Sequence, residues 1–213
     1  MRIRLNKAHF PVTVLGFGRR IGLWFQGCSV RCDGCVSRDT WDTQSGIETD
    51  VKSVLEWSRT RSERADGVTI SGGEPFDQPA ALEALLDGLH AWRTTCAQPL
   101  DVLCYSGYPM RVLEDRHSAL VRKVDAIVPE PYLRGRPSEM PLTGSANQQV
   151  ICMTALGRER YSGDETRLVK RLQVSVDDAA VWLIGIPRAG DLDAMAGECE
   201  RSGVLLKRLS WRT

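Results

Sequence analysis

The sequence predicts an α/β fold in which helices pack on a mostly parallel β-sheet. Short apolar runs alternate with longer stretches whose apolar residues recur at helical spacing, which is the pattern of consecutive βαβ units. Three of these apolar runs end in glycine-containing turns, at the strand ends where ligands bind in such folds. The chain has 213 residues, of which 42% are hydrophobic, so we expect a single domain with a sizeable core over residues 1–213.

The first half of the chain predicts two strands and two helices. Residues 21–25 are an apolar run that leads into a cysteine-containing loop, and residues 67–71 are a second run that ends in two glycines. A helix is expected from residue 50 to about residue 62, with Thr49 or Asp50 as its N-cap, and another from Pro79 to Trp92. Each helix has one apolar face, made by Val51, Val54, Leu55 and Ser58 in the first and by Leu82, Leu85, Leu86 and Leu89 in the second.

The second half continues this alternation before its pattern changes. A strand is predicted over residues 100–105, a helix from 110 to about 121 and a strand over 124–128. Residues 129–147 are rich in Pro, Gly, Arg and Ser and predict a loop across the ligand-binding edge. A hairpin over 173–182 around Asp177 and Asp178, a helix over 191–202 and a last strand over 204–209 follow. We therefore divide the domain into a core, residues 1–150, and a C-terminal extension, residues 151–213, that supplies a last βα unit or an accessory hairpin.

Charge and hydropathy argue against two functional classes. The formal net charge is +1, without the basic excess that is typical of nucleic-acid-binding proteins. The sequence has no run of about 18 apolar residues that would predict a membrane span. Residues 1–7 lack the apolar core of a signal peptide, so we expect a cytoplasmic protein. Seven cysteines in such a chain indicate a metal-binding or redox role rather than disulfides.

Three cysteines, Cys28, Cys32 and Cys35, lie within one short loop after the first predicted strand. Thiolates suit zinc and iron–sulfur clusters, and four-iron clusters are usually held by four cysteines. Three thiolates without a fourth would leave one iron open to another ligand. Two alternatives remain at this point: a chance grouping, or a zinc site completed by a distant ligand such as Cys104 or His9.

A second motif, Gly72-Gly73-Glu74-Pro75, follows the strand predicted over residues 67–71. Together with the cysteine spacing, it resembles the radical S-adenosylmethionine (SAM) superfamily. The resemblance implies a partial (β/α) barrel and a 4Fe-4S cluster whose open iron chelates the amino and carboxylate groups of SAM. It also implies reductive cleavage of SAM to methionine and a 5′-deoxyadenosyl radical, with the electron supplied by a flavodoxin or ferredoxin-type reductant.

The same resemblance assigns roles to individual residues. Cys28, Cys32 and Cys35 are expected to hold the cluster, and Gly72 and Gly73 to let backbone approach SAM, although glycines also suit a simple turn. Glu74 is expected to bind the methionyl amine, or else to be a solvated charge. Four further residues are expected near SAM, each with an ordinary turn or loop role as its alternative: Gly34, Ser106, Glu130 and Asn147.

The resemblance is closest to activating enzymes of glycyl-radical enzymes. Residues 26–42 resemble the pyruvate formate-lyase activating type, and residues 32–35, 105–108 and 144–148 resemble activators of anaerobic ribonucleotide reductase. The substrate implied is a glycyl residue of a partner enzyme. The alternatives are direct modification of a small molecule, nucleotide or peptide, and a non-catalytic module stabilised by zinc. One departure is Glu130, which lies one residue beyond the position where the reductase activators carry an aspartate, and Arg134 and Arg136 are expected to contact the substrate.

Overall fold

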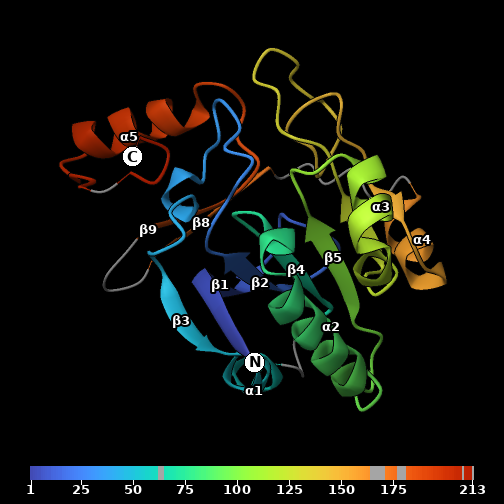
Figure 1. The fold of residues 1–213 in the computed structure, drawn as a ribbon. Helices are drawn as coiled ribbons and strands as arrows, with labels where there is room; N and C mark the ends of the chain where they lie inside the picture. The colour runs from blue at the N-terminus through green and yellow to red at the C-terminus, as the bar shows by residue number, and fades with distance from the viewer. Residues whose placement is uncertain (62–64, 164–170, 177–180, 208, 213) are drawn as a thin grey trace.

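The computed structural model describes residues 1–61, 65–163, 171–176, 181–207 and 209–212, and shows a mixed α/β fold (Figure 1). Within these residues the main sheet has seven strands in the order β3-β1-β2-β4-β5-β6-β7. These strands are β1 (Arg2–Val12), β2 (Arg20–Phe25), β3 (Ile47–Asp50), β4 (Gly67–Gly72), β5 (Asp101–Tyr105), β6 (Ala126–Val128) and β7 (Ile151–Cys152). The longer helices are α1 (Val51–Arg59), α2 (Pro79–Arg93), α3 (Met110–Val121), α4 (Ala155–Tyr161) and α5 (Asp191–Arg201).

The centre of the sheet is parallel, and its edges are antiparallel. Strands β2, β4, β5 and β6 pair in parallel, with Phe25 at the end of β2 opposite Gly72 at the end of β4. Strands β1, β3 and β7 join antiparallel. The mainly parallel α/β architecture predicted from the sequence is confirmed. The parallel register brings the cysteine loop after β2 next to the Gly-Gly-Glu turn after β4.

One face of the sheet is covered by helices. The apolar faces predicted for α1 and α2 are buried and share a core with alternate residues of β2, Ile21, Leu23 and Phe25. Because successive side chains of a strand point to opposite faces, Trp24 lies on the other side. There it joins a smaller cluster with Val12, Val14, Leu15 and Ile184. The second face of the sheet is thus closed by the N-terminal region and by the C-terminal extension.

The N-terminal strand β1 is an element that the sequence analysis missed. Its burial alternates only weakly, from fully buried Ile3 to several half-buried residues, because β2 and β3 flank it and its residues face both sides of the sheet. Residues 151–161 also pack tightly on the core. Strand β7 pairs with β6, and a Cβ added at Gly157 in α4 would lie 1.9 Å from the carbonyl oxygen of Asp125.

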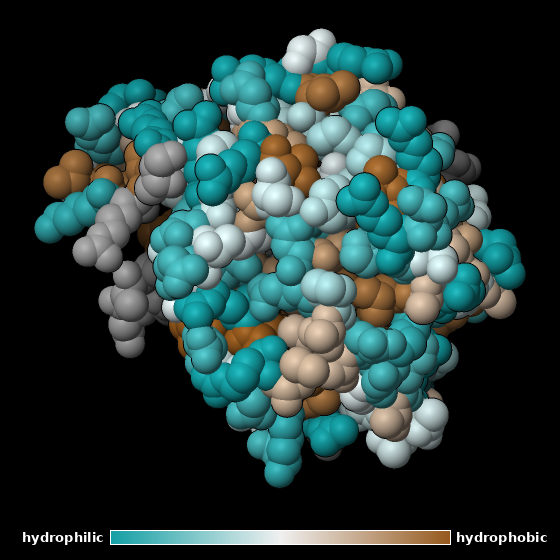
Figure 2. Space-filling model, in the orientation of Figure 1, coloured by the Kyte–Doolittle hydropathy of each residue, from teal (hydrophilic) through white to brown (hydrophobic). Residues whose placement is uncertain are grey.

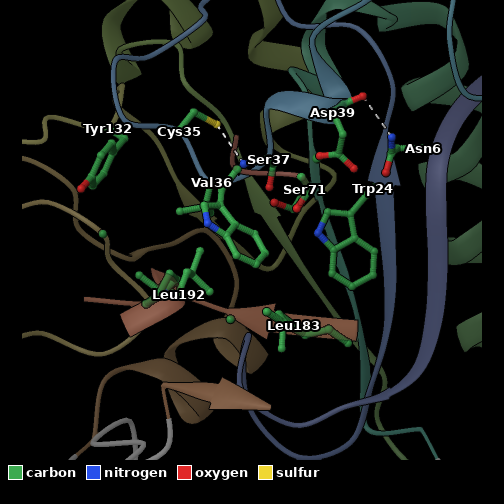
Figure 3. Close-up of a pocket in the computed structure, with 18 of the residues that line it drawn as sticks. Asn6, Trp24, Cys35, Val36, Ser37, Asp39, Ser71, Tyr132, Leu183 and Leu192 are labelled. Carbon is green, nitrogen blue, oxygen red and sulfur yellow. Dashed lines mark hydrogen bonds between the residues drawn. The ribbon is translucent and has the colours of Figure 1, made fainter. Parts of the chain in front are cut away.

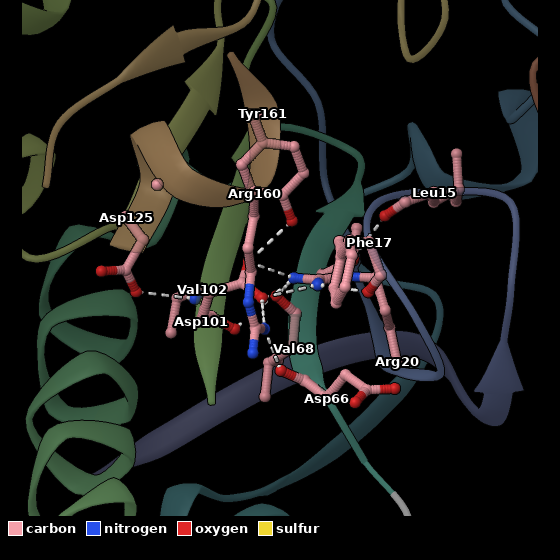
Figure 4. A network of polar contacts seen from close by, with 12 residues as sticks. Leu15, Phe17, Arg20, Asp66, Val68, Asp101, Val102, Asp125, Arg160 and Tyr161 are labelled. Atoms are coloured by element: carbon pink, nitrogen blue, oxygen red, sulfur yellow. Dashed lines mark hydrogen bonds and ion pairs between the residues drawn. The ribbon is translucent and has the colours of Figure 1, made fainter. Parts of the chain in front are cut away.

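A buried ionic network stabilises the opposite end of the parallel strands (Figure 4). Arg20, the first residue of β2, is fully buried and pairs with Asp101, the first residue of β5, at 2.8 and 2.9 Å. Tyr161 donates a hydrogen bond of 2.7 Å to the same carboxylate, and Arg160 also contacts it. Burial alone would raise the pKa of Asp101, but the charge and hydrogen bonds of Arg20 hold that pKa below its ordinary value. The network joins β2, β5 and α4 into one unit.

Beyond β7 and α4, the C-terminal extension contains a two-stranded sheet and the helix α5. Strands β8 (Leu172–Val176) and β9 (Val181–Gly185) pair antiparallel, as the predicted hairpin requires, although its turn at Asp177 and Asp178 lies outside the described residues. The prediction of a last strand over 204–209 is wrong for the residues described there, 204–207 and 209, which form no strand. Their valine and leucine side chains line a cavity instead of pairing in a sheet.

The molecular surface is mixed in polarity. Figure 2 shows a mostly hydrophilic face interrupted by separate apolar patches. Among the described residues, no helix is both long enough and apolar enough to span a membrane.

Candidate functional site

A cavity of about 1140 Å³ opens over the carboxyl ends of β2, β4 and β5. Its wall includes nine of the ten site residues expected from the sequence: Cys28, Cys32, Gly34, Cys35, Gly72, Gly73, Glu74, Ser106 and Glu130. Asn147 does not line it. The cavity exceeds the range of about 300–1,000 Å³ that is common for pockets holding one small ligand. Figure 3 shows Trp24, Cys35, Ser37 and Ser71 on one side of it and Leu183 and Leu192 on another.

The cysteine loop is held by hydrogen bonds to segments on both sides. The backbone N–H groups of Gly27 and Cys28 donate to the carbonyl oxygens of Thr40 and Trp41, at 2.7 and 3.2 Å. The N–H of Ser29 donates to Asp77 at 2.8 Å. These bonds make the start of the loop a continuation of β2, so the first cysteine lies at a fixed place at the sheet edge.

The three loop cysteines are free, half-buried thiols. Burial is the main cause that raises the pKa of Cys28, of Cys32 and of Cys35, so each thiolate needs a cationic partner. The N–H of Ser37 donates to the sulfur of Cys35 at 3.4 Å (Figure 3). Three soft donors on one loop, all lining one cavity, fit an iron–sulfur cluster with one open iron.

The zinc alternative finds no ligand set in the part of the chain that the structure describes. There, no group of three His, Cys, Asp or Glu side chains surrounds the place of a single metal ion, and this includes the three loop cysteines by themselves. Cys104 is fully buried in the core behind the sheet, and the ring of His9 lies against that of Trp182, with 4.9 Å between ring centroids. Neither residue lines the cavity with the three cysteines.

The two glycines of the second motif are explained first by packing within the protein. Gly72 has a φ of +107°, which disfavours other residues, and a Cβ there would lie 2.4 Å from the backbone nitrogen of Phe25. A Cβ on Gly73 would lie 2.0 Å from the carbonyl oxygen of Gly27. The absent side chains let the turn after β4 lie directly against the start of the cysteine loop. The expected approach of these glycines to SAM remains a prediction, but this contact already requires glycine.

Glu74 is a buried carboxylate at the junction of the two motifs. It is 0% exposed, and its oxygens accept hydrogen bonds from the N–H of Phe76 at 3.0 Å, the hydroxyl of Ser106 at 2.9 Å and the N–H of Gly107 at 2.7 Å. Burial raises the pKa of Glu74 to about 7, even though these donors lower it. The alternative of a solvated surface charge is therefore wrong. A cation bound in the cavity would favour the ionised form of this group.

The other expected site residues have local partners. Ser106 donates to Glu74 and accepts from the N–H of Tyr108 at 3.1 Å. Gly34 has a φ of +78°, and a Cβ there would lie 2.6 Å from Nε of Arg134. Glu130 accepts from the N–H of Met110, the first residue of α3, at 3.2 Å.

Asn147 lies away from the cavity and ties the 129–147 loop together. Its amide donates to the carbonyl oxygen of Pro131 at 2.8 Å. Arg134 and Arg136 also lie outside the main cavity and line a shallower groove of about 470 Å³ on the outer side of the cysteine loop.

Sequence reasoning missed several residues that build the site. Asp77 accepts from Ser29 and also from the hydroxyl of Tyr108 at 2.6 Å, which links the cysteine loop to the loop after β5. The side-chain amide of Gln26 donates to the carbonyl oxygens of Asp39 and Asp42, at 3.1 and 2.7 Å. Asp77 and Gln26 lie next to the two motifs in the sequence, which could have marked them as site residues. Their hydrogen-bond partners are distant in the sequence and could not be predicted from it. The local pattern of the C-terminal extension predicted a hairpin and a strand, but it gave no signal that these segments line the cavity.

Comparison with known proteins identifies the family. The model of the family described as "4Fe-4S single cluster domain" matches residues 14–151. The anaerobic ribonucleoside-triphosphate reductase-activating protein of Vibrio cholerae is 31% identical over 148 residues, which is 67% of this chain and 94% of that protein. The pyruvate formate-lyase 1-activating enzyme of Escherichia coli is 46% identical over 70 residues, 31% of this chain and 28% of that enzyme.

Among solved structures, QueE from Escherichia coli is similar at 17% identity and a TM-score of 0.40, over 50% of this chain and 53% of that one. The family match and the Vibrio cholerae relative carry the assignment. The chain belongs to the 4Fe-4S single cluster domain family, among the radical SAM activating proteins, and its cofactors are a 4Fe-4S cluster and SAM.

Proposed function

We propose that this protein is an activating enzyme that removes a hydrogen atom from a glycyl residue of a partner enzyme. The observation that carries the proposal is one cavity lined by three free cysteines and by the Gly72-Gly73-Glu74 turn. The relatives support it, since two of them are named for activating anaerobic ribonucleoside-triphosphate reductase and pyruvate formate-lyase. The partner in this hypothesis is a glycyl-radical enzyme of the reductase type.

The residues of the cavity divide this work between them. Cys28, Cys32 and Cys35 would hold three irons of the cluster. When bound, the reduced cluster would supply one electron and SAM would supply the sulfonium–carbon bond that this electron breaks. Together they would provide a 5′-deoxyadenosyl radical. Glu74 offers a buried carboxylate that would pair with the ammonium of SAM while it fixes the turn at Ser106. The half-buried position of the loop limits the access of water to the reacting atoms.

We propose further that the sheet acts as a partial (β/α) barrel whose concave face is this cavity. Trp24, Ser71 and Tyr105, on the strands β2, β4 and β5, line it. Residues 1–150 would then carry the cluster and SAM. Residues 151–213 would complete the wall, with β7 and α4 fixed to the core. A flavodoxin or ferredoxin-type protein would supply the electron.

The activating role can be tested directly. Protein reconstituted anaerobically with iron and sulfide is mixed with SAM and dithionite, with and without the anaerobic ribonucleotide reductase of the same organism. We expect 5′-deoxyadenosine in both samples and a glycyl radical, seen by electron paramagnetic resonance, only with the reductase. Formation of 5′-deoxyadenosine without any radical on the reductase would contradict the activating role and favour a small-molecule or peptide substrate.

A further inference from the structure

A large part of the cavity wall comes from the C-terminal extension. Strand β9 and the residues after it, together with residues 204–207 and 209–211, line the same cavity as the cysteines. Figure 3 shows Leu183 and Leu192 across the cavity from Cys35 and Ser37. Nearly all of the extension's side chains in this wall are apolar, whereas the wall formed by the core carries the thiols and Glu74. The cavity therefore has a polar floor and an apolar roof.

This roof is fixed to the core on one side through β1. The side chain of Gln173 accepts from the N–H of Thr13 at 2.8 Å and donates to the carbonyl oxygen of Pro11 at 2.7 Å. Ile184 is 3% exposed and packs in a cluster with Val12, Val14, Leu15 and Trp24.

On the other side the roof is fixed to the 129–147 loop. Arg171 donates to the carbonyl oxygen of Ser138 at 2.9 Å, and Arg188 pairs with Glu139 at 2.7 Å. The extension therefore spans the cavity from β1 to the loop, as a built part of the wall.

Apolar side chains also line the mouth of the cavity. Val36, Val181, Val204 and Leu205 all line it, and they are 37%, 38%, 48% and 71% exposed. Exposed apolar side chains gathered around a site are typical of surfaces that a partner covers. A polar small molecule would not stabilise these exposed apolar side chains by burying them. Apolar side chains of an entering peptide segment would, because contact with them removes apolar surface from water.

The extension lies beyond the region that the family model matches. The match to the Vibrio cholerae protein covers 94% of that protein with 148 residues, and the family model ends at residue 151. The match to the Vibrio cholerae protein covers 67% of this chain, so about a third of the chain has no counterpart in it. The apolar roof, which begins at β9, therefore lies outside the part of the chain that the family model matches.

We propose that the apolar roof, formed by β9 and residues 204–207 and 209–211, binds the segment of the partner that carries the reacting glycine. The segment would place apolar side chains on both sides of that glycine. This inference rests on the proposed activating function and names the chemistry of its substrate. In the reaction, the Cα–H bond of the glycine breaks homolytically, a C5′–H bond forms in 5′-deoxyadenosine, and the unpaired electron stays on the glycine.

The test uses two pentapeptides with a doubly deuterated glycine at the centre, Ser-Val-Gly-Leu-Ser and Ser-Asn-Gly-Asn-Ser. Reconstituted full-length protein, SAM and dithionite are mixed with each peptide, and deuterium in 5′-deoxyadenosine is measured by mass spectrometry. We expect about tenfold more transfer from the apolar peptide, because two apolar side chains are buried on binding.

Two matched double variants locate the effect. Val204→Asp with Leu205→Asp changes the mouth of the cavity and should abolish the preference. Val174→Asp with Val176→Asp changes two residues of similar exposure, 54% and 72%, which lie on β8 outside the cavity wall, and should keep it. Formation of 5′-deoxyadenosine without peptide should stay within about twofold in the Val174/Val176 control, which does not touch the cavity wall. In both variants the unfolding free energy and the iron content after reconstitution should match those of the unchanged protein, which shows that the fold is intact.

The possible failures separate the two hypotheses. Equal deuterium transfer from both peptides, no transfer from either, or a preference that survives in the Val204/Leu205 variant would overturn the role of the roof. If the reductase nevertheless acquires a glycyl radical, the activating function stands without it. If no 5′-deoxyadenosine forms under any condition, both the function and the inference are wrong.

Discussion

At the scale of single residues, Glu74 has both a structural role and a place in the cavity wall, and the sequence motif alone does not reveal the structural role. It joins the turn after β4 to the turn after β5 through Ser106 and Gly107, and it is one of the residues that line the cavity. Burial raises its pKa to about 7, so near neutral pH the protonated and ionised forms of the free protein are similar in energy. A bound cation would shift that balance to the carboxylate, which couples ligand binding to proton release.

The stability of the protein without cofactors should depend on pH through Glu74. Its pKa in the folded protein, about 7, lies above the ordinary value of 4.5, so the unfolded chain loses this proton first. The free energy of unfolding should therefore fall as pH rises from about 4.5 to about 7, by up to about 3 kcal/mol, and then level off. Urea unfolding at several pH values measures this. In the Glu74→Gln variant, the decrease in unfolding free energy that Glu74 causes should disappear. An identical dependence of the unfolding free energy on pH in both proteins would contradict the raised pKa of Glu74.

Gly73→Ala should damage the site although it adds a single methyl group. The new Cβ would meet the backbone oxygen of Gly27 at 2.0 Å, and a backbone atom cannot move aside as the end of a side chain can. We expect a loss of about 1–3 kcal/mol in unfolding free energy, as is usual for overpacking, together with reduced iron content after reconstitution. The control is Gly135→Ala, where a Cβ has nothing within 4 Å. Equal stability and iron content in the two variants would show that the turn adapts freely.

At the scale of elements, the cysteine loop depends on the two strands that precede the two motifs. The parallel pairing of β2 and β4 places Phe25 opposite Gly72, and the N–H of Glu74 then donates to the carbonyl oxygen of Gly27 at 2.8 Å. The loop is thereby attached to the sheet, so its thiols share a cavity wall with the turn after β4. The C-terminal hairpin has the corresponding role on the other side of the cavity.

The cluster should depend on the loop cysteines alone. Replacement of Cys28, Cys32 or Cys35 by alanine should each remove most of the approximately four irons expected per chain. Cys96→Ala and Cys199→Ala should retain them, because neither residue lines the cavity. Iron analysis and the visible absorption of the reconstituted proteins give the measurement. Full iron loading in the triple loop variant would mean that the cluster is held elsewhere.

At the scale of the whole molecule, the two ends of the parallel strands have different tasks. The carboxyl ends carry the cavity, with its half-buried thiols and exposed apolar mouth. The amino ends carry the pair between Arg20 and Asp101, both fully buried, to which Tyr161 and Arg160 are joined. The fold therefore places a fully buried ion pair away from the site, where it joins β2 and β5 and, through Tyr161 and Arg160, α4.

Arg20→Met should destabilise the whole protein rather than the site alone. The change removes the main partner of a fully buried carboxylate, which typically costs about 3–5 kcal/mol. The free energy of unfolding from urea titration at pH 7 measures the effect, with Arg59→Met at the exposed end of α1 as the control. A loss similar to that of the control would mean that Arg160 and Tyr161 compensate for Arg20.

The sequence by itself determined the features that depend on residues close together in the chain. Strand–helix alternation predicted the parallel centre of the sheet, and the apolar stripes predicted the buried faces of α1 and α2 because helical periodicity is local. The three cysteines and the Gly-Gly-Glu turn resemble the radical SAM superfamily, and this resemblance implied the two cofactors; the family match and the relatives confirm them.

Only the tertiary structure decided what depends on residues far apart in the sequence. The glycines of the second motif are required by contact with Phe25 and Gly27, across two paired strands. The raised pKa of Glu74 follows from its burial, which outweighs the lowering by its three hydrogen-bond donors. The apolar roof forms because Gln173 bonds to Pro11 and Thr13, some 160 positions away, and no local pattern encodes such a contact.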